Sequence, residues 1–130
     1  MAAEPRWVPI EAVIAINRDI VGQTAEPHDV RNRQALQTAI AHPWNVWVYF
    51  MDRDIPMLTA RLFTSLAGAQ AFAAGNKRTA YRAAITFIES NGYTFDPPQQ
   101  HAIDRLLGYF DGKLGQTGVV EWFRWGMTPV

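Results

Sequence analysis

The 130-residue chain contains no cysteine, no long apolar run and no excess of charge of either sign. Without cysteine there can be no disulfide, thiolate nucleophile or Cys-ligated zinc, as is typical of a reducing compartment. No segment approaches the ~18 apolar residues of a membrane-spanning helix, and Glu4 and Pro5 stand where a secretory signal would be apolar. Twelve basic residues balance twelve acidic ones, so no overall field attracts nucleic acid or anionic lipid. We expect a cytoplasmic protein without a direct nucleic-acid or membrane partner.

The rest of the composition is that of an ordinary globular protein. Apolar types make up 48% of the residues and charged types 18%, which excludes disorder and collagen-like repeats. No internal repeat and no linker-like segment divides the chain. A length of 130 residues fits one domain of ~100 to 200 residues, so we expect a single domain over residues 1–130.

Apolar residues recur at helical spacing along most of the chain. Helices are expected over 10–21, over about ten residues after Asn32 up to Pro43, over 57–69 and 79–91, from Asp96 to Gly112, and from Thr117 or Gly118 through Trp125. The β-branched and aromatic residues of 46–50, followed by turn residues at 52–56, predict a strand in a hairpin or flap. The pattern therefore predicts an all-α fold, a compact six-helix bundle with one short β-hairpin or flap.

The helical phases also predict which side chains are buried. Asn17 and Arg18 fall on the polar side of the first helix, and Glu89 and Asp96 are expected in solvent. The fifth helix is expected to bury Ile103, Leu106, Leu107 and Phe110. The core is expected to contain Ile14, Leu62, Leu66, Ala80, Ala84, Phe87 and Ile88.

The segment between the third and fourth helices combines glycine, asparagine and two cations. Gly75 lets the backbone approach a ligand, and the first free N–H groups of the following helix attract anions. Lys77 and Arg78 add two full charges, and arginine can bind a phosphate through two hydrogen bonds. The alternative is a capped helix with two solvated basic residues. The segment is not a Walker A loop, because the second Gly and the Lys-Ser/Thr pair are absent.

The same segment resembles the signature of a known family. It reads Phe72-Ala73-Ala74-Gly75-Asn76-Lys77-Arg78-Thr79-Ala80 and is followed by a helix that ends at Asn91-Gly92. This resembles the motif of the Fic/Doc proteins, His-x-Phe-x-Asp/Glu-Gly/Ala-Asn-Lys/Gly-Arg. The resemblance is closest to the death-on-curing (Doc) branch, the toxins of type II toxin–antitoxin pairs, and extends back over the earlier helices.

This resemblance implies a bundle in which the loop and the next helix N-terminus bind the phosphates of ATP or a related nucleotide. Gly75, Asn76 and Thr79 would belong to the anion-binding set, and Lys77 and Arg78 would also stabilise the transferred charge. Fic members transfer AMP to a protein hydroxyl, and the Doc branch transfers phosphate to a translation factor. The resemblance also implies an antitoxin partner, and a flap at residues 46–52 that positions the target.

Two positions depart from the family motif. Gln70 stands at the position of the catalytic histidine, and an amide has no base that titrates near pH 7. Ala74 stands at the position of the acidic residue that holds magnesium, and its side chain has no oxygen. The sequence thus keeps the anion-binding half of the motif without its base or its Mg²⁺ ligand. Two changes fit a natural variant better than one engineered inactivation.

The remaining chemistry-bearing residues give no stronger signal. His28, His42 and His101 lack the spacing of a transition-metal site, so no metal is predicted. The tryptophan pairs 44/47 and 122/125 indicate core packing or a groove for a partner.

Three functions remain open. The first is a Doc-like toxin component with impaired or altered catalysis. The second is a catalytically silent domain that binds a nucleotide, a phosphorylated ligand or a partner protein. The third is a member repurposed for other chemistry in a biosynthetic pathway.

Overall fold

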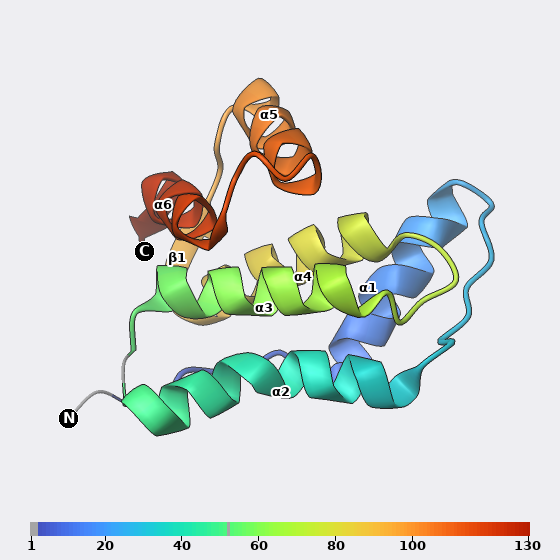
Figure 1. The fold of residues 1–130 in the computed structure, drawn as a ribbon, viewed down its shortest axis with the longest axis horizontal. Coiled ribbons are helices and arrows are strands. Elements are labelled where there is room, and N and C mark those ends of the chain that lie inside the picture. Colours follow the sequence, from blue (N-terminus) through green and yellow to red (C-terminus); the bar gives the residue numbers. More distant parts are fainter. Residues whose placement is uncertain (1–2, 52) are drawn as a thin grey trace.

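The computed structural model describes residues 3–51 and 53–130 and is mostly helical (Figure 1). Its elements are α1 (Ile10–Gln23), α2 (Arg33–Phe50), α3 (Ile55–Ala69), α4 (Asn76–Ser90), β1 (Tyr93–Phe95), α5 (Gln99–Phe110), α6 (Gln116–Gly126) and β2 (Met127–Pro129). The all-α prediction with six helices is confirmed. None of the helices in the described part of the chain is long and apolar enough to span a membrane.

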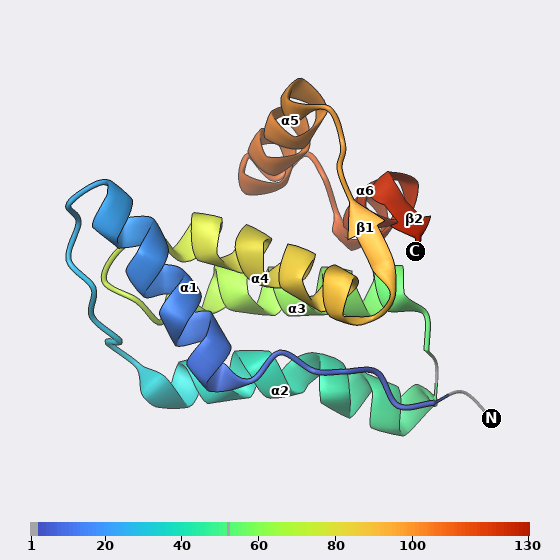
Figure 2. The same cartoon turned by 180° about the vertical axis from the view of Figure 1, so that it is seen from behind.

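Helices α3 and α4 lie side by side in the middle of the bundle (Figures 1 and 2). Helices α1 and α2 pack on one side of this pair, and α6 packs on the other side against α3. The small side chains of Ala80, Ala83 and Ala84 are buried on α4 and allow it to approach its neighbours closely. All seven predicted core side chains are buried, with Phe87 and Ile88 fully so.

The predicted strand at 46–50 is wrong, because α2 continues through Pro43 to Phe50. A proline inside a helix leaves the carbonyl four residues earlier without its N–H donor. Here that carbonyl belongs to Ala39, and the Ser65 hydroxyl of α3 donates to it at 2.8 Å. The helix ends only at Met51, whose φ of +52° is left-handed. The expected hairpin or flap is therefore absent over residues 46–51, while Asp52 of the expected turn lies outside the described residues.

The small β-sheet lies elsewhere, and the sequence pattern did not reveal it. Strands β1 and β2 pair antiparallel, with Thr94 opposite Thr128 and Phe95 opposite Met127. Strands of three residues are too short to show an alternating pattern. A Cβ at Gly126 would clash with the ring of Phe95, so this glycine lets the end of α6 approach β1.

Helix α5 stands away from the rest of the bundle (Figure 2), and its predicted buried face is only partly correct. Leu106 and Phe110 are half-buried, but Ile103 and Leu107 are 40% and 58% exposed. Ala102 is the buried residue of this helix. Its hydrophobic stripe thus borders an open cleft instead of a closed core.

Candidate functional site

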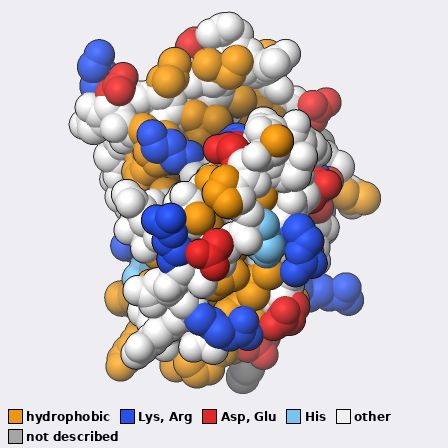
Figure 3. Space-filling view, turned by 90° about the vertical axis from the view of Figure 1, so that its right-hand side faces the viewer, with side chains coloured by type: hydrophobic (Ala, Val, Ile, Leu, Met, Phe, Trp, Pro, Cys, Tyr) orange, Lys and Arg blue, Asp and Glu red, His pale blue; other side chains and the backbone are white. Residues whose placement is uncertain are grey.

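The loop between α3 and α4 lies at the right-hand end of the bundle in Figure 1, the side that Figure 3 presents to the viewer. It begins at Gln70, which ends α3 with a left-handed φ of +46°. The following residues align against the segment after α1: Ala73 N donates to Asp29 O at 2.9 Å, and Arg31 N donates to Ala71 O at 2.8 Å. These backbone hydrogen bonds fix the loop in place before any ligand binds.

Asn76 closes this loop with its own side chain. Its Nδ2 donates to Phe72 O at 2.8 Å, and its Oδ1 accepts from Phe72 N at 3.0 Å. Both polar atoms of the amide are therefore engaged within the loop. What Asn76 can offer a ligand is its backbone N–H at the first position of α4.

Gly75 follows with a φ of +76° and lies directly against α1. A Cβ at this position would come within 2.9 Å of Val21 Cγ1 and 3.3 Å of Asn17 Nδ2. Glycine is required here both by the left-handed backbone and by this close approach.

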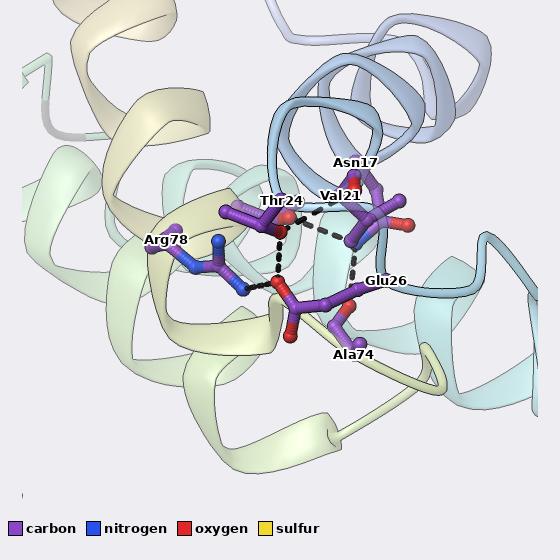
Figure 4. Close-up of polar contacts among 7 residues, drawn as sticks. Asn17, Val21, Thr24, Glu26, Ala74 and Arg78 are labelled. Carbon is purple, nitrogen blue, oxygen red and sulfur yellow. Dashed lines mark hydrogen bonds and ion pairs between the residues drawn. The ribbon is translucent and has the colours of Figure 1, made fainter.

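Asn17 is fully buried between α1 and the loop, and it holds the loop through hydrogen bonds (Figure 4). Its Nδ2 donates to Ala74 O at 2.8 Å and to Thr79 Oγ1 at 3.0 Å, and its Oδ1 accepts from His28 Nδ1 at 2.9 Å. The expectation that Asn17 lies on the polar side of α1 is wrong. The sequence did contain a signal that Asn17 is buried: it lies three residues after Ile14 and three before Ile20, on the apolar stripe of the helix.

The same contacts show where Thr79 lies. Its side chain is 1% exposed and its hydroxyl faces Asn17. Thr79 therefore supports the loop from the inside, and it is not among the residues that line the pocket described next.

The N-terminus of α4 opens into a pocket of about 360 Å³. No side chain in the described part of the chain caps this 15-residue helix, so its first N–H groups and its dipole favour an anion. The pocket brings together five of the predicted site residues with two others: Ala67, Gln70, Gly75, Asn76, Lys77, Arg78 and Phe110.

Each cation near this pocket already has a partner. Lys77 Nζ lies 4.8 Å from the ring centroid of Phe110, a cation–π contact. Arg78 Nη2 donates to Glu26 Oε1 at 2.6 Å, and one turn later Arg82 pairs with Asp19 at 3.6 Å. Figure 3 accordingly shows basic and acidic side chains alternating on this face instead of a uniform positive patch.

The Glu26 carboxylate is fixed by its surroundings (Figure 4). Hydrogen bonds from the Thr24 hydroxyl and from Arg78 lower the pKa of Glu26 below its ordinary value, against a smaller opposing effect of burial. Glu26 N also donates to Val21 O at 3.0 Å, which ties this segment to the end of α1. An ionised carboxylate thus lies where the guanidinium of Arg78 would meet an anion.

A second pocket of about 640 Å³ adjoins the first and shares Lys77, Arg78 and Phe110 with it. It runs along one face of α4 between α1 and α5. Its walls are mainly apolar and include Ile20, Tyr81, Ile85, Leu106 and Leu107. Burial raises the pKa of Tyr81 above its ordinary value, so this phenol stays neutral at physiological pH.

Among the described residues, the lining of the smaller pocket contains no histidine or carboxylate, and no metal cluster. Gln70 reaches its lining with a neutral amide, and the titratable side chains among the described lining residues are Lys77 and Arg78. No group of three or more His, Asp or Glu among the described residues could hold a metal ion. Ala74 offers no side-chain oxygen, and its carbonyl accepts from Asn17. The arrangement suits binding of an anion.

Comparison of the sequence with known protein families identifies a relationship that includes this loop. The sequence model of the Fic/DOC family matches residues 7–88, the part of the chain that contains α1 to α3, the loop and most of α4. Comparison with curated proteins yields no match. Since the match spans more than half of the chain and includes the loop built above, the chain belongs to the Fic/DOC family.

Proposed function

We propose that this Fic/DOC chain binds the phosphate groups of ATP or a related phosphorylated ligand at the N-terminus of α4, with transfer chemistry that is impaired or altered. The observation that carries the proposal is the uncapped helix start that opens into the 360 Å³ pocket beside Lys77 and Arg78. Helix N–H groups and two cations are the elements that bind phosphate oxygens.

Within this proposal, the backbone of Gly75 and Asn76 and the first turn of α4 contact the phosphate. Lys77 and Arg78 supply the positive charge. The apolar part of the ligand occupies the adjoining 640 Å³ pocket, against Tyr81 and Phe110. The two pockets together fit an anion attached to a planar or apolar group, and a nucleotide is such a ligand.

Gln70 and Ala74 are the reason to propose weakened transfer. At Gln70 the side chain cannot accept the proton of an attacking hydroxyl, and loss of a general base typically costs ~10² to 10⁴ in rate. Ala74 leaves Mg²⁺ without the usual side-chain ligand, which removes a further stabilisation of the transferred charge. The continuation of α2 through residues 46–50 adds a third reason, because the flap expected to position a target is helical there.

A Doc-like toxin that acts on a translation factor and is neutralised by an antitoxin is the second candidate. Family membership favours it, whereas the missing base and flap favour a binding role or a repurposed chemistry. A small antitoxin-like reading frame beside the gene supports the toxin, and a biosynthetic cluster supports repurposing.

Calorimetry with ATP, AMP and inorganic phosphate tests the binding proposal. Arg78→Ala is expected to weaken binding of the phosphorylated ligand by ~1.5 to 3 kcal/mol, the range of a charged hydrogen bond. Arg33→Ala is the matched control, because Arg33 is a comparably exposed arginine in an ion pair with Glu11 at 3.1 Å and lines neither of the two pockets. Equal affinities in the wild type and Arg78→Ala, or no binding of any of the three probes, would contradict the proposal.

A further inference from the structure

Helix α2 presents an uncharged outer face that no other described element covers. From Gln34 to Met51 the sequence has no Asp, Glu, Lys or Arg. Figures 1 and 2 place α2 at the lower edge of the bundle, with α3 above it. The outer face of a helix in a monomeric protein is normally charged or polar, so this composition calls for an explanation.

The exposed residues of α2 follow the spacing of a helix–helix seam. Gln34, Gln37, Ala41, Trp44 and Val48 are separated by three, four, three and four residues, and all five are exposed. This alternation places the five side chains in one stripe and is typical of a helix that packs lengthwise against another helix. The intramolecular neighbour α3 contacts the opposite, buried face, which includes Leu36 and Ala39.

The second half of this stripe is apolar. Trp44 and Val48 are 43% and 40% exposed, and Tyr49 next to them is 83% exposed. These three side chains together expose on the order of 300 Å² of mostly apolar surface. Phe50, nine residues after Ala41, points to the opposite side of the helix.

We propose that α2 packs antiparallel against α2 of a second copy of this chain, with the two-fold axis near Ala41. The stripe from Gln34 to Val48 has no charged residue and so meets no repulsion from its own copy, and a two-fold interface must be complementary to itself. The small side chain of Ala41 allows the two helix axes to come close at the centre. The amides of Gln34 and Gln37 supply a polar rim, and a specific interface of about 800 Å² per partner is within reach of one 18-residue helix with its flanks.

The antiparallel direction follows from the difference between the two halves of α2. The aromatic residues lie in the second half, from Trp44 onward, whereas the first half begins with the cation Arg33. Around an axis at Ala41, Arg33 of one copy lies near the C-terminal end of the other α2, where the helix dipole favours a cation. A parallel pair would instead place the two Arg33 side chains next to each other.

Sedimentation equilibrium of the full chain tests the association. The wild type is expected to be a dimer at micromolar concentrations, and Ala41→Glu, which puts two carboxylates beside the axis, is expected to be a monomer with an unchanged helical spectrum. The matched control is Ala15→Glu on α1, which adds the same charge at another exposed helical alanine and should leave the dimer intact. A wild type that stays monomeric at high micromolar concentration, or an Ala41→Glu variant that remains a dimer, overturns the proposal.

Single cysteines test the geometry cleanly because the chain has none of its own. Ala41→Cys is expected to form an intermolecular disulfide under mild oxidation, since it faces its own copy across the axis, whereas Ala15→Cys is not. Gln34→Cys mixed with Val48→Cys is expected to cross-link more than either variant alone. Preferential self-linking of Val48→Cys would indicate a parallel pair and overturn the antiparallel arrangement. Failure of Ala41→Cys to link would place the interface elsewhere.

Discussion

The carboxylate of Glu26 lies 2.6 Å from Nη2 of Arg78 and so occupies a guanidinium that the Fic/DOC motif would offer to a phosphate. Both side chains are partly exposed, so water and salt weaken their attraction and an incoming anion can share or replace the contact. The pair offsets the charge of Arg78 and leaves Lys77 as the cation of the pocket that has no carboxylate partner among the described residues. In the binding that we propose, Glu26 therefore competes with the phosphate of the ligand for Arg78.

Glu26→Gln should strengthen binding of a phosphorylated ligand. Removing the carboxylate frees Arg78 and removes a negative charge that repels phosphate, so affinity for ATP or inorganic phosphate should rise roughly two- to tenfold at low salt, with a smaller gain at high salt. Titration calorimetry at two ionic strengths measures the effect. Glu11→Gln, which breaks the exposed pair with Arg33, should leave affinity unchanged. Weaker binding in Glu26→Gln would show that the carboxylate organises the site instead of competing for it.

Asn17 should control both the stability of the fold and the shape of the anion loop. Asn17→Leu keeps a side chain of similar size but leaves the Ala74 carbonyl and the Thr79 hydroxyl without their buried donor, at a cost of ~1 to 3 kcal/mol in the free energy of unfolding. Ligand affinity should fall with it, because the loop loses its support. Thr59→Val is the control, since it removes a buried hydrogen bond to Ile55 O within α3. It should lower stability in urea unfolding without changing affinity, and an Asn17→Leu variant with wild-type affinity would separate Asn17 from the site.

The Ser65 hydroxyl should matter because α2 contains Pro43. Ser65→Ala leaves the Ala39 carbonyl without a donor and should lower the free energy of unfolding by ~1 kcal/mol. In a Pro43→Ala background, residue 43 regains the N–H that bonds to Ala39 in an ordinary helix. In that background, Ser65→Ala should lower the free energy of unfolding by a smaller amount. A double-mutant cycle measured by urea unfolding gives this coupling; additive effects would mean that Ser65 does not compensate for the proline.

His42 should make the protein sensitive to mild acid. Burial of the ring, with a smaller contribution from the Arg61 charge, holds the pKa of His42 below its ordinary value of 6.5. The unfolded chain therefore binds this proton at a higher pH than the folded chain does. The contribution of His42 to the free energy of unfolding is fully present above pH 6.5 and declines as the pH falls below it. In urea unfolding at several pH values, His42→Gln should flatten that decline. An unchanged pH profile would assign the acid sensitivity to other groups.

Local sequence patterns were sufficient where neighbours in the chain decide the structure. The stripe of Ala80, Ala84, Phe87 and Ile88 predicted the central helix, and Gly75 followed by Lys77 and Arg78 predicted an open helix start. The pattern at 46–50 failed because strand propensity competes with tertiary context, and the Ser65 hydroxyl that compensates for Pro43 comes from another helix. The β1–β2 pair depends on contacts across more than thirty residues, which no local window contains.

The candidate site likewise combines features that local sequence predicts with contacts that only the fold creates. The identity and spacing of Gly75, Lys77 and Arg78 indicated an anion pocket, but sequence could not show that the Asn76 amide is engaged by Phe72 or that Glu26 holds Arg78. Glu26 lies in a loop without periodicity, 52 residues before its partner. Such pairings are set by the way α1 packs against α4.

The double change Gln70→His and Ala74→Asp tests whether these two side chains account for the impaired transfer that we propose. Gln70 lines the pocket at the start of α4, so a histidine there offers a base to an incoming hydroxyl, and an aspartate at 74 offers a ligand for Mg²⁺. Transfer of labelled phosphate or AMP to the protein itself or to a translation factor should appear or rise with ATP and Mg²⁺ present. Because base and metal stabilise the same transition state, each single change should achieve much less than the pair.

The wild type and the three variants need one shared control, which is nucleotide affinity measured by calorimetry, so that a folded but inactive variant is distinguished from one that no longer binds. Ala74 lies between the Asn17 hydrogen bond to its carbonyl and the left-handed Gly75, and an aspartate there must reach the pocket without breaking that bond. If the double variant binds ATP but transfers nothing, the helical segment 46–50 in place of a target-positioning flap becomes the deciding loss, and the binding role is strengthened. If the unaltered chain already transfers as fast as the double variant, Gln70 does not limit the reaction and a base from elsewhere in the fold must act on the hydroxyl.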